Sequence, residues 1–219
     1  MNTKINAIIP AGGTSSRFGN TNKLLEKINS KEVIRYTIDA FEASHVNEII
    51  ICANVSIIDE LKKIFASYEK VKIIEGGQTR QASVFNGLKA SVCNYVLIHD
   101  GARPMITTDL INSAINMVKD KKALTVATKT IDTMKEVVDG KIIRTIDRSK
   151  LYNTQTPQVF EYDLIMNAHQ KFIGQNFTDD AGMLEELGYD VYILNGSYKN
   201  IKITTQNDID IAKVYLQNM

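Results

Sequence analysis

Short apolar runs rich in β-branched residues alternate along this chain with helix-length segments, and this alternation constrains the fold more than any other sequence feature. The six predicted strands are 7–10, 48–53, 71–75, 95–99, 124–128 and 191–194. Elsewhere apolar residues recur at three- and four-residue spacing, which predicts helices at 33–43, 57–68, 80–91, 109–119 and 207–216. This order is typical of a Rossmann-like, doubly wound α/β fold, with a mostly parallel sheet covered by helices on both faces.

Length and composition predict a single domain spanning residues 1–219. With 219 residues, of which 44% are hydrophobic, the chain can bury one good core. A formal net charge of +1 argues against nucleic acid or an anionic membrane as a partner. No apolar run reaches the roughly 18 residues of a membrane span, and the N-terminus lacks a signal-peptide pattern, so we expect a cytoplasmic protein. Cys52 and Cys93 lack metal-ligand spacing and are expected to pack as small hydrophobic residues.

One segment breaks the alternation of strands and helices. Residues 133–145 read as two short strands joined by Asp139-Gly140, a strong signal for a two-residue hairpin turn. We predict a β-arm at about 132–156 that projects from the main sheet. An exposed two-stranded hairpin is marginally stable alone, so we expect the arm to pack on a second copy of the chain in a homodimer. The alternative is a surface hairpin without a partner.

Small and polar residues follow three of the predicted strands. They occupy 11–17 after the first strand, 76–83 after the third and 99–104 after the fourth. Ligands of open α/β sheets bind beyond the carboxyl ends of the strands, so these segments predict a binding site. In the first segment the glycines would let the backbone approach a nucleotide, and Arg17 suits its phosphates, although Gly and Ser also form ordinary tight turns.

With these segments, the chain resembles the bacterial 2-C-methyl-D-erythritol 4-phosphate cytidylyltransferases over nearly its whole length. Seven stretches in order carry the resemblance, and together they are highly specific. They are 10–17, 76–84, 99–104, 132–135, 155–158, 178–181 and 200–204. The resemblance implies transfer of CMP from CTP to the phosphate of a sugar alcohol with release of pyrophosphate, in non-mevalonate isoprenoid synthesis.

The resemblance also implies a CTP site. Arg17 and Lys23 would be catalytic, binding the triphosphate and stabilising the pentavalent transition state, because two polyanions repel each other unless cations lie between them. Mg²⁺ or another divalent cation would be held mainly by the CTP phosphates, with Asp100 as its candidate protein ligand. The CTP-binding residues so implied are Pro10, Ala11, Gly12, Gly13, Gly77, Gln78, Ser83, Asp100 and Gly101.

The acceptor site implied by the resemblance is rich in cations and hydroxyl groups. It consists of Arg103, Thr133, Arg148, Thr156 and Lys202. Arg148 and Lys202 would supply opposing cations for the acceptor phosphate, with the arm residues reaching across a dimer interface. No general base is required, because a phosphate monoester has a second pKa of about 6 and is mostly dianionic at neutral pH. We therefore expect a structural role for His99.

Several positions depart from the family's usual pattern. Ser15 stands where a second glycine is common, Gln78 where an acidic residue often occurs, and residues 22–24 where Pro-Lys-Gln is usual. We expect these changes to affect loop geometry and CTP affinity while leaving the cations in place. Two alternatives stay open: a ribitol 5-phosphate cytidylyltransferase, which differs chiefly in the acceptor pocket, and a non-catalytic nucleotide-binding protein on the same fold.

Overall fold

Strand β1 (Ile5–Ala11) is buried on both of its faces and lies inside a seven-stranded sheet. The computed structural model describes residues 3–13, 18 and 22–217. Within β1, Ile9 packs into one hydrophobic cluster and Ile8 into another on the opposite face of the sheet. A strand that is apolar in consecutive positions is typical of a parallel sheet covered on both sides.

The main sheet has the strand order β11-β7-β10-β6-β1-β4-β5 among the described residues. The strands after β1 are β4 (Glu48–Ala53), β5 (Val71–Glu75), β6 (Tyr95–Ile98), β7 (Ala123–Lys129), β10 (Tyr152–Glu161) and β11 (Tyr192–Asn195). Strand β10 pairs antiparallel with β6 and β7, whereas the other pairs are parallel. The chain leaves β1 toward β4 on one side and returns to β6 on the other, which places a topological switch point at the carboxyl end of β1.

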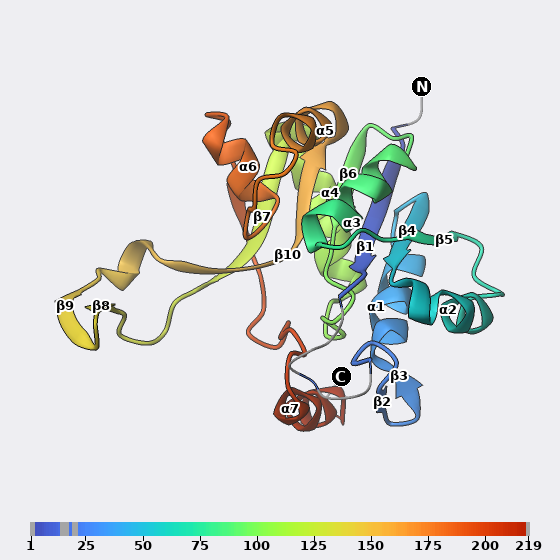
Figure 1. The fold of residues 1–219 in the computed structure, drawn as a ribbon, viewed down its shortest axis with the longest axis horizontal. Helices are drawn as coiled ribbons and strands as arrows, with labels where there is room; N and C mark the ends of the chain where they lie inside the picture. The colour runs from blue at the N-terminus through green and yellow to red at the C-terminus, as the bar shows by residue number, and fades with distance from the viewer. Residues whose placement is uncertain (1–2, 14–17, 19–21, 218–219) are drawn as a thin grey trace.

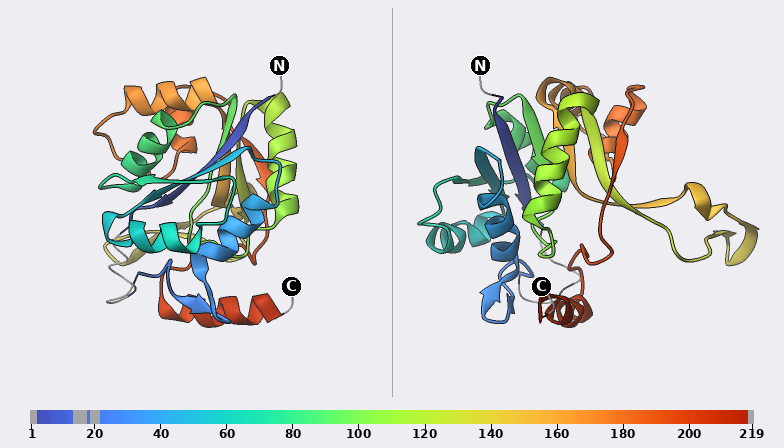
Figure 2. Two further views of the ribbon diagram at one scale, coloured as in Figure 1. Left: turned by 90° about the vertical axis from the view of Figure 1, so that its right-hand side faces the viewer. Right: turned by 180° about the vertical axis from the view of Figure 1, so that it is seen from behind.

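Helices cover both faces of the sheet, as Figures 1 and 2 show. One cluster is shared with α1 (Val33–Glu42), α2 (Ile58–Ile64), α4 (Thr108–Lys121) and α7 (Gln206–Gln217). The other is shared with α3 (Arg80–Lys89), α5 (Tyr162–Lys171) and α6 (Ala181–Glu186). The short strands β2 (Lys27–Ile28) and β3 (Lys31–Glu32) form a separate sheet near α7, beyond the carboxyl ends of the main strands (Figure 1). Two 3₁₀ turns, η1 (Val55–Ile57) and η2 (Arg148–Lys150), complete the elements described.

The predicted hairpin is present and lies outside the main sheet. Strands β8 (Lys135–Val138) and β9 (Lys141–Thr145) pair with each other and extend to one side of the molecule (Figure 1). Asp139 and Gly140 have φ angles of 49° and 76°, as the tight hairpin turn requires.

The mostly parallel α/β architecture and all six predicted strands are confirmed, with strand ends shifted by two residues or fewer. The strand of the main sheet that the sequence did not predict is β10, which lies between β6 and β7. It takes residues 152–156, the last part of the predicted arm, into the main sheet. The short strands β2 and β3 and the helix α6 were not predicted either.

Two smaller predictions concern the cysteines and membrane helices. Cys52 is buried, and burial raises the pKa of its thiol to about 12, which fits a packing role. Cys93 is half-buried, and both thiols are free. In the part of the chain that the structure describes, none of the helices is both long enough and apolar enough to span a membrane.

Candidate active site

Two adjoining pockets lie at the carboxyl ends of β1 and β6, at the switch point of the sheet. The β1 pocket is lined by Pro10, Ala11, Gly12, Gly13, Lys23, Leu24, Gln78, Thr79, Arg80, Asp100, Gly101, Ala102 and Lys202. The β10 pocket is lined by Arg80, Asp100, Arg103, Thr154, Gln155, Thr156, Gln158, Thr178, Asp179 and Lys202. The two pockets share Arg80, Asp100 and Lys202, so a ligand in one would meet a ligand in the other at these three residues.

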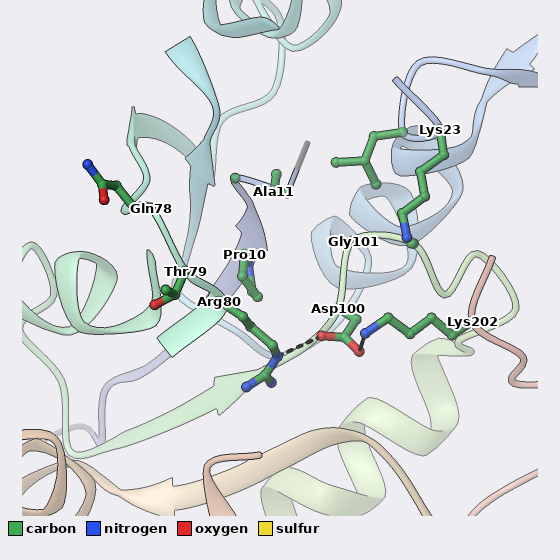
Figure 3. A pocket seen from close by; sticks show the side chains of 13 residues that line it. Pro10, Ala11, Lys23, Gln78, Thr79, Arg80, Asp100, Gly101 and Lys202 are labelled. Carbon is green, nitrogen blue, oxygen red and sulfur yellow. Dashed lines mark hydrogen bonds and ion pairs between the residues drawn. The ribbon is translucent and has the colours of Figure 1, made fainter. Parts of the chain in front are cut away.

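Asp100 is the anionic centre of the two pockets. Its carboxylate receives Arg80 Nε at 3.0 Å, Lys202 Nζ at 2.8 Å and, more distantly, Arg103 Nε at 3.7 Å. Figure 3 shows Arg80 and Lys202 converging on Asp100 from opposite sides. Burial alone would raise the pKa of Asp100, but these three cations hold that pKa well below its usual range, so the carboxylate stays ionised.

Thr156 and His99 hold the backbone around Asp100. The Thr156 hydroxyl accepts a hydrogen bond from the Asp100 backbone N–H at 3.1 Å and lies 3.0 Å from His99 Nδ1. His99 Nε2 lies 3.4 Å from the Arg103 carbonyl oxygen, which assigns the proton to Nε2 and makes Nδ1 the acceptor for Thr156. Burial lowers the pKa of His99 to about 3, so the ring is neutral at pH 7. This geometry supports the structural role predicted for His99.

Lys202 reaches Asp100 because hydrogen bonds hold the residues on both sides of it in the chain. The Ile203 backbone N–H donates to the Ala102 carbonyl at 2.8 Å, beside the end of β6. Asn200 is fully buried, and its side chain donates to the Thr156 carbonyl at 2.9 Å. The Asn200 backbone carbonyl in turn accepts a hydrogen bond from Arg103 Nη1 at 2.7 Å. These bonds between distant segments place two cations of the β10 pocket relative to each other.

The glycine loops approach one another too closely for side chains. A Cβ atom on Gly12 would lie 2.7 Å from Ser83 Oγ and 3.2 Å from the Gly77 carbonyl oxygen. Ser83 is buried, accepts from the Gly77 backbone N–H at 3.0 Å and donates to the Thr79 carbonyl at 2.9 Å. Ser83 therefore shapes the loop after β5, and its direct contact with a base stays a prediction. Gly77 lines a further hollow with Gly12 and Gln78, next to the β1 pocket.

The structure gathers most of the predicted site residues, but not all of them. The predicted CTP residues other than Ser83 line the β1 pocket or the hollow beside it, and Lys23 extends into the β1 pocket (Figure 3). Arg103, Thr156 and Lys202 line the β10 pocket. Thr133 and Arg148 lie on the exposed arm outside both pockets, where Arg148 donates to the Ile131 carbonyl. Arg17 lies outside the described residues.

The fit of a divalent cation rests on Asp100. Among the described residues, no cluster of three or more His, Cys, Asp or Glu side chains could hold a metal ion. The lining of the β1 pocket contains one carboxylate, Asp100, whose oxygens already face three cations. Mg²⁺ is usually bound by one or two carboxylates together with substrate phosphates. The residues therefore fit an ion held mainly by a nucleotide's phosphates, with Asp100 as its one candidate ligand from this pocket's described lining.

Arg80 belongs to both pockets but was not among the predicted site residues. It is the first residue of α3, where the positive end of the helix dipole disfavours a cation. A cation at such a position, directly after a glycine-rich strand end, is a signal that could have singled it out. Its second carboxylate partner, Asp180, is 100 positions away and could not be found by local pattern.

Glycine loops at the switch point of an α/β sheet, with a second cationic pocket adjoining them, fit the class of the nucleotidyltransferases. The chain belongs to the 2-C-methyl-D-erythritol 4-phosphate cytidylyltransferase family, whose model matches residues 5–218. This finding confirms the family and the enzyme class predicted from the sequence motifs.

Individual relatives match over more than nine-tenths of both chains. The chain is 42% identical to a 2-C-methyl-D-erythritol 4-phosphate cytidylyltransferase of Alkaliphilus oremlandii, covering 98% of this chain and 96% of that one. It is 40% identical to the Clostridioides difficile protein of the same name, covering 95% and 92%. The crystal structure of 4-diphosphocytidyl-2C-methyl-D-erythritol synthase from Anaerococcus prevotii is 34% identical, with a TM-score of 0.89 and coverage of 98% and 96%.

Proposed function

We propose that the protein transfers CMP from CTP to 2-C-methyl-D-erythritol 4-phosphate, giving 4-diphosphocytidyl-2-C-methyl-D-erythritol and pyrophosphate. The observation that carries this proposal is the pair of pockets that share Arg80, Asp100 and Lys202. CTP occupies the β1 pocket and the hollow beside it, and the sugar-alcohol phosphate occupies the β10 pocket. An acceptor oxygen then lies next to the α-phosphorus, which is the arrangement that phosphoryl-type transfer needs.

The chemistry requires concentrated positive charge more than acid–base groups. The acceptor phosphate is mostly dianionic at pH 7, so one of its oxygens attacks the α-phosphorus directly and pyrophosphate leaves. Repulsion between the two reactants is offset by Lys23 and Arg17 on the triphosphate and by Lys202 and Arg103 on the acceptor. A divalent cation such as Mg²⁺, held mainly by CTP and assisted by Asp100, would neutralise triphosphate oxygens when bound.

We also propose that the arm, residues 132–151 together with the start of β10, serves a homodimer of this single-domain chain. Its exposed apolar side chains support this: Val137, Val138, Ile142 and Ile143 are 52 to 63% exposed. A two-stranded hairpin gains stability when such a surface packs on something else. In the dimer, Thr133 and Arg148 of one copy complete the acceptor site of the other. A cytoplasmic location stays a prediction.

The test is pyrophosphate release from CTP and Mg²⁺ with 2-C-methyl-D-erythritol 4-phosphate, run beside ribitol 5-phosphate at equal concentrations. We expect a clear preference for the erythritol acceptor. Preference for ribitol 5-phosphate would overturn the proposed acceptor while keeping the CTP site and the mechanism. Release with neither acceptor would overturn the proposed function and favour a non-catalytic nucleotide-binding protein.

A further inference from the structure

Arg80 bridges two carboxylates that lie far apart in the sequence. Its Nε lies 3.0 Å from Asp100 Oδ1, at the junction of the two pockets, and its Nη1 lies 2.7 Å from Asp180 Oδ2. The Arg80 side chain is 27% exposed, Asp100 is 10% exposed and Asp180 is fully buried. Arg80 therefore connects a carboxylate that faces the substrates with one that does not.

Asp180 is held by contacts with His169 on α5 and with Gln158, which belongs to the lining of the β10 pocket. Its Oδ1 lies 3.1 Å from His169 Nε2 on α5, and its backbone N–H donates to Gln158 Oε1 on β10 at 2.9 Å. The His169 ring is in turn stacked on Phe85 of α3, with an interplanar angle of 2°. Asp180 lines neither pocket. It is a rigid anchor behind Arg80 with no direct access to a substrate.

The position of Arg80 carries an electrostatic and a desolvation cost, which indicates a functional role in addition to any role in folding. A guanidinium at the first residue of α3 opposes the helix dipole. Taking it and two carboxylates out of water also carries a desolvation cost that their mutual attraction only partly repays. Apolar residues of similar volume would fill this space without that cost. What the ionic arrangement provides is a fixed orientation for the Asp100 carboxylate.

We propose that Arg80, anchored by Asp180, is a positioning residue that holds the Asp100 carboxylate at the junction of the two pockets. This inference rests on the proposed transfer reaction. Without Arg80, Asp100 would be neutralised by Lys202 and Arg103 alone, which are the cations that the acceptor phosphate needs. With Arg80 in place, Asp100 keeps a permanent partner, and Lys202 and Arg103 can turn to the acceptor.

The first experiment compares the steady-state kinetics of three variants with those of the full-length wild-type enzyme. Asp180→Asn keeps the shape of the anchor and removes its charge, Arg80→Lys keeps the charge and removes the two-armed geometry, and Arg80→Ala removes both. For Asp180→Asn and Arg80→Lys we expect kcat to fall roughly 10- to 100-fold, because small misplacements of reacting groups cost that much. We expect the KM for CTP to change less than about threefold, since the β1 pocket keeps Lys23.

The second experiment is chemical rescue of Arg80→Ala. Guanidinium chloride at low millimolar concentration can enter the space left by the side chain and pair with Asp100 and Asp180. Urea has the same shape without the charge and serves as the matched solute. We expect guanidinium, but not urea, to raise kcat at least fivefold, a result that a purely structural loss of packing would not give. Arg35→Ala is the matched protein control, since Arg35 lies on α1 and bonds the Tyr68 hydroxyl away from both pockets.

The outcomes separate this inference from the proposed function. If wild-type enzyme releases pyrophosphate and Asp180→Asn keeps a wild-type kcat, the positioning role is overturned, because Arg80 then works without its anchor. Equal rescue by urea, or loss of activity only in proportion to loss of folded protein in thermal melts, overturns it as well. A wild-type enzyme that is inactive with both acceptors instead overturns the proposed function itself.

Discussion

The main sheet and the arm both contain β-branched apolar residues, but the sheet buries them and the arm exposes them. In the sheet, Ile8 and Ile50 are fully buried, whereas Ile142 on the arm is 63% exposed. Burying a large apolar side chain stabilises a folded protein by about 1.5 to 3 kcal/mol. Within one chain, the exposed side chains of the arm do not contribute this stabilisation. The sheet thus buries its apolar side chains within one chain, whereas we expect the arm to bury its own against a second copy.

The charged residues also differ between the two regions: those near the sheet are held by other segments of the chain, and those on the arm are mostly exposed. In the sheet region Arg80, Arg103 and Lys202 converge on Asp100, and each is held by bonds to other segments. On the arm, Arg148 is exposed and donates to a nearby backbone carbonyl. We infer from this comparison that the proposed nucleotide half of the site is formed within one chain, whereas the arm would contribute to the acceptor half only in a dimer. The following predictions test that division.

The largest expected effect comes from the proposed nucleotide half. Lys23→Ala removes a cation from the lining of the β1 pocket, where the other two described cations, Arg80 and Lys202, both pair with Asp100. We expect kcat to fall roughly 100- to 1,000-fold, as is typical when a preorganised charge that stabilises the transition state is lost. Steady-state pyrophosphate release measures it, with Lys63→Ala on α2 as a control. A decrease of less than threefold would remove Lys23 from the catalytic residues.

The next effect should appear in assembly and not in folding. Ile142→Asp places a charge on the apolar surface of the arm, and in a symmetric dimer the change occurs twice. We expect the dimer dissociation constant to rise roughly 100-fold, equivalent to about 3 kcal/mol, while the thermal midpoint of the monomer stays the same. Sedimentation equilibrium measures the first quantity and calorimetry the second.

Val92→Asp is the matched control for the arm variant. Val92 is 78% exposed in the turn before β6, far along the chain from the arm. It should leave the dimer unchanged. If Ile142→Asp behaved like Val92→Asp, the arm would be a surface hairpin without a partner, and the contrast between the two regions would disappear.

Arg148→Ala tests whether the arm supplies part of the acceptor site. We expect the KM for the acceptor to rise about tenfold and the KM for CTP to stay nearly constant, because a charge-assisted hydrogen bond to phosphate contributes about 1.5 to 3 kcal/mol. The dimer should persist, since the exposed apolar residues of the arm are unchanged. An unchanged acceptor KM would exclude Arg148 from the acceptor site.

A subunit-mixing experiment decides whether Arg148 acts on the other chain. In a mixed dimer of Lys23→Ala and Arg148→Ala subunits, one site combines an intact β1 pocket with an intact arm from the other copy. If the arm acts across the interface, mixing should restore activity at low acceptor concentration above the mean of the two parent variants. Activity that only averages the parents would show that each arm serves its own chain.

Sequence patterns found the parts of the fold that depend on local chemistry. The parallel strands are short, mostly apolar runs rich in β-branched residues, and the Asp139-Gly140 turn fixes the hairpin by its positive φ angles. Strand β10 was not predicted, because residues 152–158 are mostly polar and contain Pro157, which argues against a central strand. The structure accommodates Pro157 where the pairing of β10 with β7 shifts register between Thr154 and Gln158.

The site was predictable where a single segment carries the chemistry, and less so where segments meet. The strand-end loops could be located from the sequence pattern, together with Arg17 as a cation suited to phosphates, whereas the resemblance supplied Lys23, Arg103 and Lys202. The pairing of Arg80 with Asp180, and of Asn200 with Thr156, depends on segments 100 and 44 positions apart. Such contacts are set by the topology of the sheet. Local sequence patterns therefore could not show that Asp100 is shared by three cations.

The smallest expected effect concerns the segment that carries Lys202, which ends at the start of α7. Asp208 accepts hydrogen bonds from the backbone N–H groups of Thr204 and Thr205 at 2.8 Å and from both threonine hydroxyls, so its carboxylate ties the chain down at the start of the helix. Asp208→Ala should lower the free energy of unfolding by about 1 kcal/mol at pH 7, measured by urea titration. Asp210→Ala is the control, because Asp210 lies two residues further along α7 and forms an exposed ion pair with Lys213.

The effect of Asp208 should also depend on pH in a definite direction. Burial raises the pKa of Asp208, but the hydrogen bonds from Thr204 and Thr205 outweigh burial, so the pKa lies below its ordinary value. A carboxylate with a depressed pKa stabilises the folded state above its unfolded pKa of about 3.9, and this contribution is lost as pH falls through the folded pKa. The difference between wild type and Asp208→Ala should therefore be constant from pH 7 to 5 and shrink below about pH 4. If the KM for the acceptor also rises in Asp208→Ala, the position of Lys202 depends on contacts at the start of α7. If only the free energy of unfolding changes, the rest of the site is enough to hold Lys202 in place.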